Sequence, residues 1–121
     1  MVTACLFMGF GRPAPGREEE GFAFLMREGM DTLQRYQKEG WYESFQFAGL
    51  TPHGGDLNAF VILNGERAKL DELRRTDDFE KLSMRLMRLF TGYGVIPGVT
   101  GDGIRRFKER NPDLVTQREI P

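Results

Sequence analysis

The chain has 121 residues and a formal net charge of −1, with 17 Lys and Arg against 18 Asp and Glu. This balance provides no strong field for nucleic acid or an anionic membrane, so we expect neither as a partner. No apolar run approaches the ~20 residues of a membrane span. The single cysteine, Cys5, cannot form an internal disulfide, and this lack of a disulfide framework fits a cytoplasmic protein.

The first third of the chain predicts a strand followed by a long helix. Residues 2–10 are almost all apolar or small, as in a strand covered on both faces. The Gly- and Pro-rich segment 11–16 is then a loop at a sheet end, where ligands often bind, although a plain connector is the simpler interpretation. A helix is expected over 17–38, with Gly40 as its stop. Its apolar stripe consists of Phe22, Leu25, Met26, Met30, Leu33 and Tyr36.

Residues 41–50 and 57–63 are predicted to be two antiparallel strands joined by a Gly-rich hairpin loop, and Asn64-Gly65 is predicted to be a turn. Period-two alternation in the first of these strands separates two sets of side chains. One face would carry Trp41, Glu43, Phe45 and Phe47, and the other Tyr42, Ser44, Gln46 and Ala48. The second set resembles either the wall of a half-hydrated pocket or an ordinary solvent-facing surface, and both interpretations stay open.

Helical periodicity resumes at Glu66 and is interrupted before a restart near Thr76. Thr76, Asp77 or Asp78 can cap the second helix, and Asp77 with Glu80 has the spacing of a capping box. This helix carries the strongest apolar stripe of the chain, which consists of Phe79, Leu82, Leu86 and Leu89, widened by Phe90. Burial of each such side chain is worth roughly 1.5–3 kcal/mol, so the stripe needs a sheet to pack against.

A fourth strand is expected over 93–100, and Pro97 makes it an edge, bulged or short strand. A short helix is expected over 104–110. The predicted organisation is a single domain over residues 1–110 with a C-terminal tail over 111–121 that is either loose or reaches a partner subunit.

The element order β-α-β-β-α-β predicts an α+β protein with a ferredoxin-like fold, in which a four-stranded antiparallel sheet carries helices on one face. The opposite face would hold Cys5, Phe7, Phe60 and Ile62. These side chains are too apolar to leave in water, so we expect two copies to dimerise through this face.

The chain resembles the dimeric α/β-barrel superfamily. The resemblance covers the element order over residues 1–104 and the broken second helix, in which the restart at 76–82 follows the segment 63–65 and contains an Asp-Phe-x-x-Leu pattern. It implies a homodimer with a pocket between sheet and helices in each subunit. The superfamily includes cofactor-independent monooxygenases, haem-binding and haem-degrading enzymes, lactone isomerases and ligand-sensing modules, and the fold does not choose among them.

Two sets of candidate site residues follow from the sequence. His53, the only histidine, is a candidate general base or haem ligand, because imidazole exchanges protons near neutral pH. It stands in a hairpin loop, where exposure is the commoner outcome. The second set would orient a small polar or aromatic ligand, with Tyr42 as a further catalytic candidate. It comprises Tyr42, Ser44, Gln46, Tyr93 and Asp102. The alternative is that Tyr93 packs in the core and Asp102 only forms its turn.

The leading hypothesis is therefore a small homodimer with a pocket for an organic ligand, with monooxygenase- or isomerase-like activity as its enzymatic form. We expect no metal site and no bound cofactor, since one histidine gives no metal-ligand spacing. A non-catalytic ligand-binding or protein-interaction module and a haem-handling protein are the alternatives.

Overall fold

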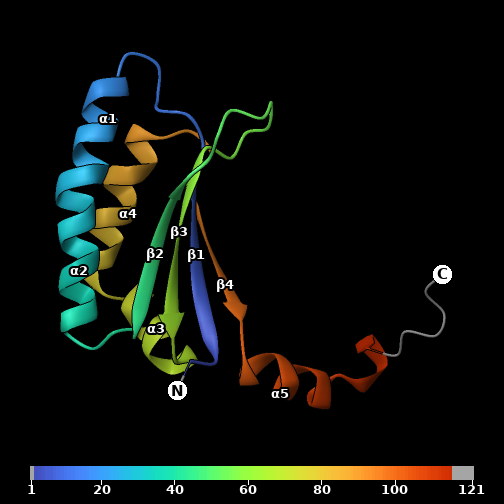
Figure 1. Cartoon of the computed structure of the whole chain (residues 1–121). Coiled ribbons are helices and arrows are strands. Elements are labelled where there is room, and N and C mark those ends of the chain that lie inside the picture. Colours follow the sequence, from blue (N-terminus) through green and yellow to red (C-terminus); the bar gives the residue numbers. More distant parts are fainter. Residues whose placement is uncertain (1, 116–121) are drawn as a thin grey trace.

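A computed structural model of the chain describes residues 2–115 and shows one antiparallel sheet with a layer of helices on one face (Figure 1). The strands lie in the order β2-β3-β1-β4. Their bounds are β1 Ala4–Phe10, β2 Ser44–Gly49, β3 Ala59–Gly65 and β4 Gly94–Val99. The predicted ferredoxin-like α+β fold is confirmed.

The helices account for most of the remaining chain. The first helical segment comprises α1 Glu18–Phe24, a π-helical turn at Leu25–Gly29 and α2 Met30–Lys38. The second comprises α3 Arg67–Arg74 and α4 Asp77–Leu89. The C-terminal part contains α5 Asp102–Arg110 and a short 3-10 helix at Pro112–Val115. No helix within residues 2–115 has the length and apolar character that a membrane crossing requires.

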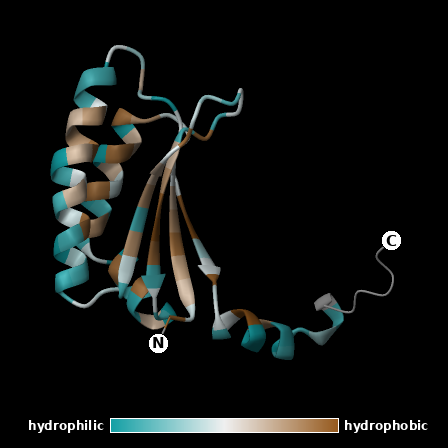
Figure 2. Ribbon diagram, in the orientation of Figure 1, coloured by the Kyte–Doolittle hydropathy of each residue, from teal (hydrophilic) through white to brown (hydrophobic). Residues whose placement is uncertain are grey.

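The core lies between the sheet and the helices. Leu6 of β1 pairs with Leu63 of β3, and both are completely buried on the helix-facing side. The predicted α4 stripe packs against this side, and it is buried throughout: Phe79, Leu82, Leu86, Leu89, with Phe90 beside it. Figure 2 shows the matching hydrophobic bands along the central strands.

The restart before α4 is capped by Thr76, one of the three predicted candidates. Its hydroxyl accepts a hydrogen bond from the Phe79 N–H at 3.2 Å and donates one to the Leu73 carbonyl at 2.7 Å. The suggested capping box between Asp77 and Glu80 does not form, because the helix begins one residue earlier than that pattern requires.

The boundaries of β2 and β3 correct three expectations. The turn predicted at Asn64-Gly65 is wrong, because both residues remain in β3 and pair with Cys5 and Ala4 of β1. Strand β2 begins only at Ser44, so the preceding residues do not follow the alternation assumed for 41–50. The third strand starts at Ala59 rather than at residue 57.

The first long helix was predicted correctly in extent, but its apolar stripe was only partly right. Leu25, Leu33 and Tyr36 are buried, whereas Phe22 is 54% and Met26 is 53% exposed. The π-helical turn contains an extra residue relative to α-helical winding, and it changes which side chains share a face. A strict 3.6-residue period therefore misplaces them.

The last strand and the C-terminal segment largely follow expectation. Strand β4 is an edge of the sheet and contains Pro97 opposite Leu6, as the missing proline N–H requires. Helix α5 extends from the end of β4, away from the helical layer (Figure 1). The predicted tail at 111–121 begins with the 3-10 helix Pro112–Val115, and its residues from 116 onward lie outside the described residues.

The face of the sheet opposite the helices carries the apolar side chains that the sequence placed there. The rings of Phe7 and Phe60 stack with centroids 5.3 Å apart, and Ile62 pairs across the strands with Phe7. Ile96 on the neighbouring edge strand is 60% exposed. We call the surface formed by Cys5, Phe7, Phe60, Ile62 and Ile96 the open face.

Candidate functional site

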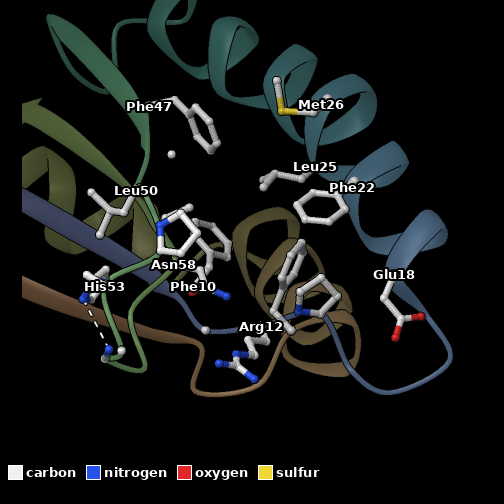
Figure 3. A pocket seen from close by; sticks show the side chains of 18 residues that line it. Phe10, Arg12, Glu18, Phe22, Leu25, Met26, Phe47, Leu50, His53 and Asn58 are labelled. Carbon is white, nitrogen blue, oxygen red and sulfur yellow. Dashed lines mark hydrogen bonds between the residues drawn. The ribbon is translucent and has the colours of Figure 1, made fainter.

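A cleft of about 650 Å³ lies between the helix-facing side of the sheet and the first long helix. Figure 3 shows side chains from four segments converging on it. Most of its lining is apolar, and this part consists of Phe10, Pro13, Phe22, Leu25, Met26, Phe47, Leu50, Pro52, Ala59 and Phe90. Its polar side chains are Arg12, Glu18, His53 and Asn58.

The loop after β1 forms one wall and is held in place by the segment after α4. Gly11 donates its N–H to the Thr91 carbonyl, and Thr91 donates its own N–H to the Arg12 carbonyl, each at 2.8 Å. The Thr91 hydroxyl adds a second hydrogen bond to the Arg12 carbonyl at 3.0 Å. A Cβ atom on Gly11 would lie 2.4 Å from the Thr91 oxygen, so only glycine permits this approach.

The π-helical turn forms a second wall. Leu25 begins this turn and is buried against the floor of the cleft, while Met26 points into it from the helix (Figure 3). π-helical turns occur frequently at functional sites because they change the direction of side chains without ending the helix. The exposure of Phe22 and Met26, which a packed apolar stripe does not predict, is thus exposure to the cleft.

His53 lies at the rim of the cleft, in the loop between β2 and β3. Its Nδ1 accepts a hydrogen bond from the Gly55 N–H at 3.3 Å, and its Nε2 lies 2.8 Å from the Leu57 carbonyl. A carbonyl only accepts, so the proton of the neutral ring is on Nε2. Both ring nitrogens are therefore engaged within the loop, and the side chain orders the rim rather than presenting a free base.

Arg12 and Asn58 supply the uncommitted polar groups. The backbone of Asn58 is fixed, since its N–H donates to the Phe10 carbonyl and its carbonyl accepts from Leu50, both at 2.8 Å. Neither the Arg12 guanidinium nor the Asn58 carboxamide has a hydrogen-bond or ion-pair partner among residues 2–115. Glu18, by contrast, accepts the Gly16 N–H at 3.3 Å.

Tyr42, the second catalytic candidate, lies away from this cleft. It is 4% exposed, its ring packs edge-on against Phe45, and its hydroxyl donates to the Leu33 carbonyl. Burial raises the pKa of this phenol well above its usual range. These contacts anchor α2 to the sheet, and they follow from the late start of β2, which leaves Tyr42 on the core side.

The other predicted ligand-binding residues are not brought together. Ser44 and Gln46 lie on the open face of β2, at one edge of the sheet, whereas Tyr93 precedes β4 at the other edge. The Tyr93 hydroxyl is 2.9 Å from the Ser83 hydroxyl. The pKa of Tyr93 is raised overall, because burial raises it more than the hydrogen bond with Ser83 lowers it. Asp102 begins α5. The expectation failed because it took the strands carrying Gln46 and Tyr93 as neighbours.

Sequence reasoning missed most of the cleft. It assigned Phe22, Leu25 and Met26 to a core stripe, and it named neither Arg12 nor Asn58 as candidates. The available signal was the position of loop 11–16 at a sheet end, together with the glycines that allow two loops to approach each other there. Within residues 2–115, no group of three or more His, Cys, Asp or Glu side chains could hold a metal ion.

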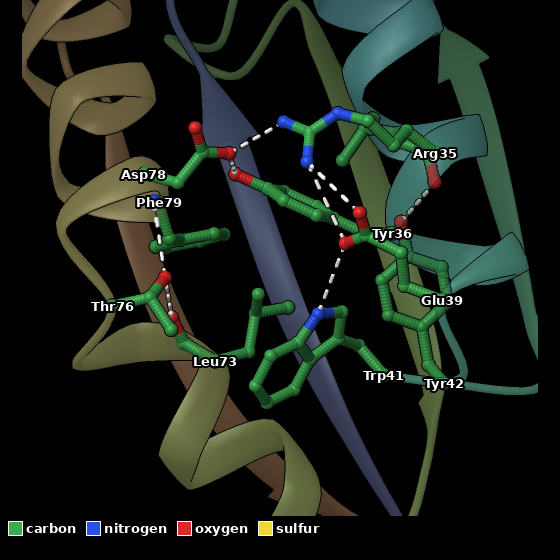
Figure 4. A network of polar contacts seen from close by, with 10 residues as sticks. Arg35, Tyr36, Glu39, Trp41, Tyr42, Leu73, Thr76, Asp78 and Phe79 are labelled. Carbon is green, nitrogen blue, oxygen red and sulfur yellow. Dashed lines mark hydrogen bonds and ion pairs between the residues drawn. The ribbon is translucent and has the colours of Figure 1, made fainter.

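A second polar cluster joins the two long helices on their outer side (Figure 4). Asp78 accepts a hydrogen bond from the Tyr36 hydroxyl and an ion-paired one from Arg35, each at 2.6 Å. Arg35 also pairs with Glu39 at 3.2 Å. The Tyr36 hydrogen bond and then the Arg35 contact lower the pKa of Asp78. Every partner is satisfied within the cluster, so we interpret it as a structural brace.

This brace predicts an acid-sensitive contribution to stability. The lowered pKa means that the folded state favours the Asp78 carboxylate, so its contribution is present above the unfolded-state value of about 3.9 and is lost as the pH falls through the folded-state pKa. Asp78→Asn should therefore lower the free energy of unfolding at neutral pH, and its difference from the wild type should shrink in acid. Urea unfolding of the wild type and the variant, from neutral pH down to acid pH, measures this difference, with Asp77→Asn as the control.

No protein-family model matches the chain, and no curated protein matches it in sequence. Solved structures do resemble it. An ethyl tert-butyl ether D (EthD) family protein from Bacillus halodurans is 12% identical, with a TM-score of 0.61, over 82% of this chain and 99% of that chain.

Two further structures show the same similarity. A dimeric protein of unknown function with a ferredoxin-like fold, from Bacteroides fragilis, is 5% identical with a TM-score of 0.59, over 80% of this chain and 96% of that chain. A Pseudomonas aeruginosa protein is 18% identical with a TM-score of 0.58, over 84% of this chain and 96% of that chain. At these identities the likeness shows the fold alone, and it confirms the ferredoxin-like fold.

Proposed function

We propose that the protein is a homodimer that binds a small organic ligand with a large apolar or aromatic part in the cleft beside the π-helical turn. The observation that carries this proposal is the cleft itself, which measures about 650 Å³ and is lined mainly by apolar and aromatic side chains. Ligand pockets typically measure roughly 300–1,000 Å³ and combine such a lining with a few polar groups. Arg12 and Asn58 supply those groups here.

Binding is favoured over catalysis by the state of His53. A general base must have a ring nitrogen free for the proton that it removes, and both nitrogens of His53 are engaged by Gly55 and Leu57. A monooxygenase- or isomerase-like reaction that used His53 as its base would require these two contacts to break first. Haem is a less favoured ligand than an apolar organic molecule for the same reason. His53 is the only histidine of the chain, and its two ring nitrogens are engaged by Gly55 and Leu57 rather than free to bind iron.

The open face supports the homodimer. It combines the stacked pair Phe7 and Phe60 with Ile62 and the 60%-exposed Ile96, so its burial against a second copy would remove a continuous apolar surface from water. One structural neighbour with the same fold is a dimeric protein. The helical layer lies on the opposite side of the sheet from the open face (Figure 1), and the first long helix of that layer forms one wall of the cleft.

A titration with a neutral fluorescent probe tests the binding proposal. N-phenylnaphthylamine becomes fluorescent when it enters an apolar site. We expect saturable enhancement with one probe per protomer, while analytical ultracentrifugation of the same sample gives the mass of a dimer. An enhancement that rises linearly without saturation, or none at all, would remove the ligand-binding proposal, and a monomer at all accessible concentrations would remove the dimer.

A further inference from the structure

We infer that the cleft selects an organic acid, with the Arg12 guanidinium binding the carboxylate and the aromatic half of the cleft binding the apolar body. This inference rests on the proposed binding function and specifies its ligand class. In the lining of the cleft, the positively charged Arg12 and the apolar side chains of the helix lie on different sides. Figure 3 shows Arg12 in the loop after β1, on the side of the cleft opposite Met26 and the π-helical turn.

The backbone of Arg12 is positioned by the fold. Its carbonyl accepts from both the N–H and the hydroxyl of Thr91, at 2.8 and 3.0 Å, and the preceding Gly11 is tied to the Thr91 carbonyl. The rigid attachment fixes where the side chain starts. A ligand would therefore meet a guanidinium whose main chain needs no reorganisation, which reduces the cost of binding.

The Arg12 side chain is also free to take an anion. Some arginines of the chain are already engaged, as Arg35 is with Asp78 and Arg85 is with Glu20. Within residues 2–115 the Arg12 guanidinium has no acidic partner, although it lines an apolar cleft. Arg12 is exposed while it lines the cleft, so its positive charge is accessible to an anionic ligand group there.

A carboxylate matches the Arg12 guanidinium better than the alternative ligand groups do. The guanidinium presents a planar fork of donors that matches the two carboxylate oxygens. The carboxamide of Asn58 can add one more donor. A phosphate would offer more acceptors than these two side chains satisfy. An organic cation would need Glu18, which already accepts the Gly16 N–H and stands among exposed acidic residues at the start of α1.

Matched ligands that differ only in charge test this inference. Phenylbutyrate and its primary amide share one apolar body, and each is titrated into the full-length protein preloaded with N-phenylnaphthylamine at neutral pH. We expect the acid to displace the probe at a concentration that is lower than that of the amide by roughly tenfold or more, as a charge-assisted contact implies. In Arg12→Gln this preference should vanish, because the acid loses far more affinity than the amide does. Arg74→Gln removes the same charge from α3 and should keep the preference.

The outcomes separate this inference from the proposal beneath it. Equal displacement by acid and amide in the wild type, or a preference that survives in Arg12→Gln, overturns the carboxylate assignment and leaves the apolar cleft standing. Tighter binding of phenyl phosphate with the same dependence on Arg12 overturns it in favour of a phosphate. Failure of the wild type to bind the neutral probe overturns the binding function itself.

Discussion

The Ala59→Trp variant should bind N-phenylnaphthylamine roughly tenfold more weakly than the wild type or worse, a loss of about 1.4 kcal/mol or more. Ala59 is the first residue of β3 and lines the cleft, opposite Phe10 on one neighbouring strand and Gly49 on the other. An indole attached there would occupy space that the probe requires. Because the cleft is open to solvent on one side, the larger side chain can be accommodated without displacing the core.

The matched control is Ala68→Trp. Ala68 lies on the exposed side of α3, outside the cleft, so this variant adds the same ring without changing the cavity. We expect it to bind the probe as the wild type does. Circular dichroism of both variants should match the wild type, which confirms that the fold is retained. Undiminished binding by a folded Ala59→Trp variant would show that the probe occupies another site.

The second large effect is expected at the open face, where Ile62→Glu should raise the dissociation constant of the dimer by roughly a hundredfold or more. In a symmetric dimer the substitution places two carboxylates in one apolar interface, and uncompensated buried charges cost several kcal/mol. In the isolated protomer Ile62 is partly exposed, so a carboxylate there can remain hydrated and the fold should persist. Sedimentation velocity over a concentration series measures the shift.

Met84→Glu is the control for the added charge. Met84 is 52% exposed on α4, on the other side of the molecule from the open face. This variant should remain a dimer with the wild-type dissociation constant. If Ile62→Glu also remains a dimer at the same concentrations, the open face is not the interface, and the dimer must form through another surface.

The sequence was sufficient to predict the element order and the layers, because those depend on periodicity. Leu86 and Leu89 repeat at helical spacing and pack on the sheet, and Pro97 marked an edge strand correctly. The residues of the open face were also identified, since Phe7 and Ile62 alternate with buried neighbours along their strands. Each of these inferences used contacts that local pattern determines.

The cleft could not be predicted in the same way, because it depends on segments that are distant in sequence. Arg12 is positioned by Thr91, and that pairing leaves no periodic signal in either segment. The π-helical turn redirects Met26, although the sequence around it reads as an ordinary helix. Tyr42 was misplaced for a third reason, since the predicted alternation began three residues before the true start of β2 at Ser44. Exact strand ends are set by tertiary contacts rather than by propensity.

The most direct test of the central claim, that the cleft is the ligand site, is an amide chemical-shift map of the wild-type dimer titrated with phenylbutyrate. The account predicts that the largest shifts fall on the backbone of the cleft walls, at Gly11, Arg12, Met26 and Asn58, and that they saturate together. Saturating shifts centred instead on Phe7, Ile62 and Ile96 would place the ligand on the open face and contradict the account.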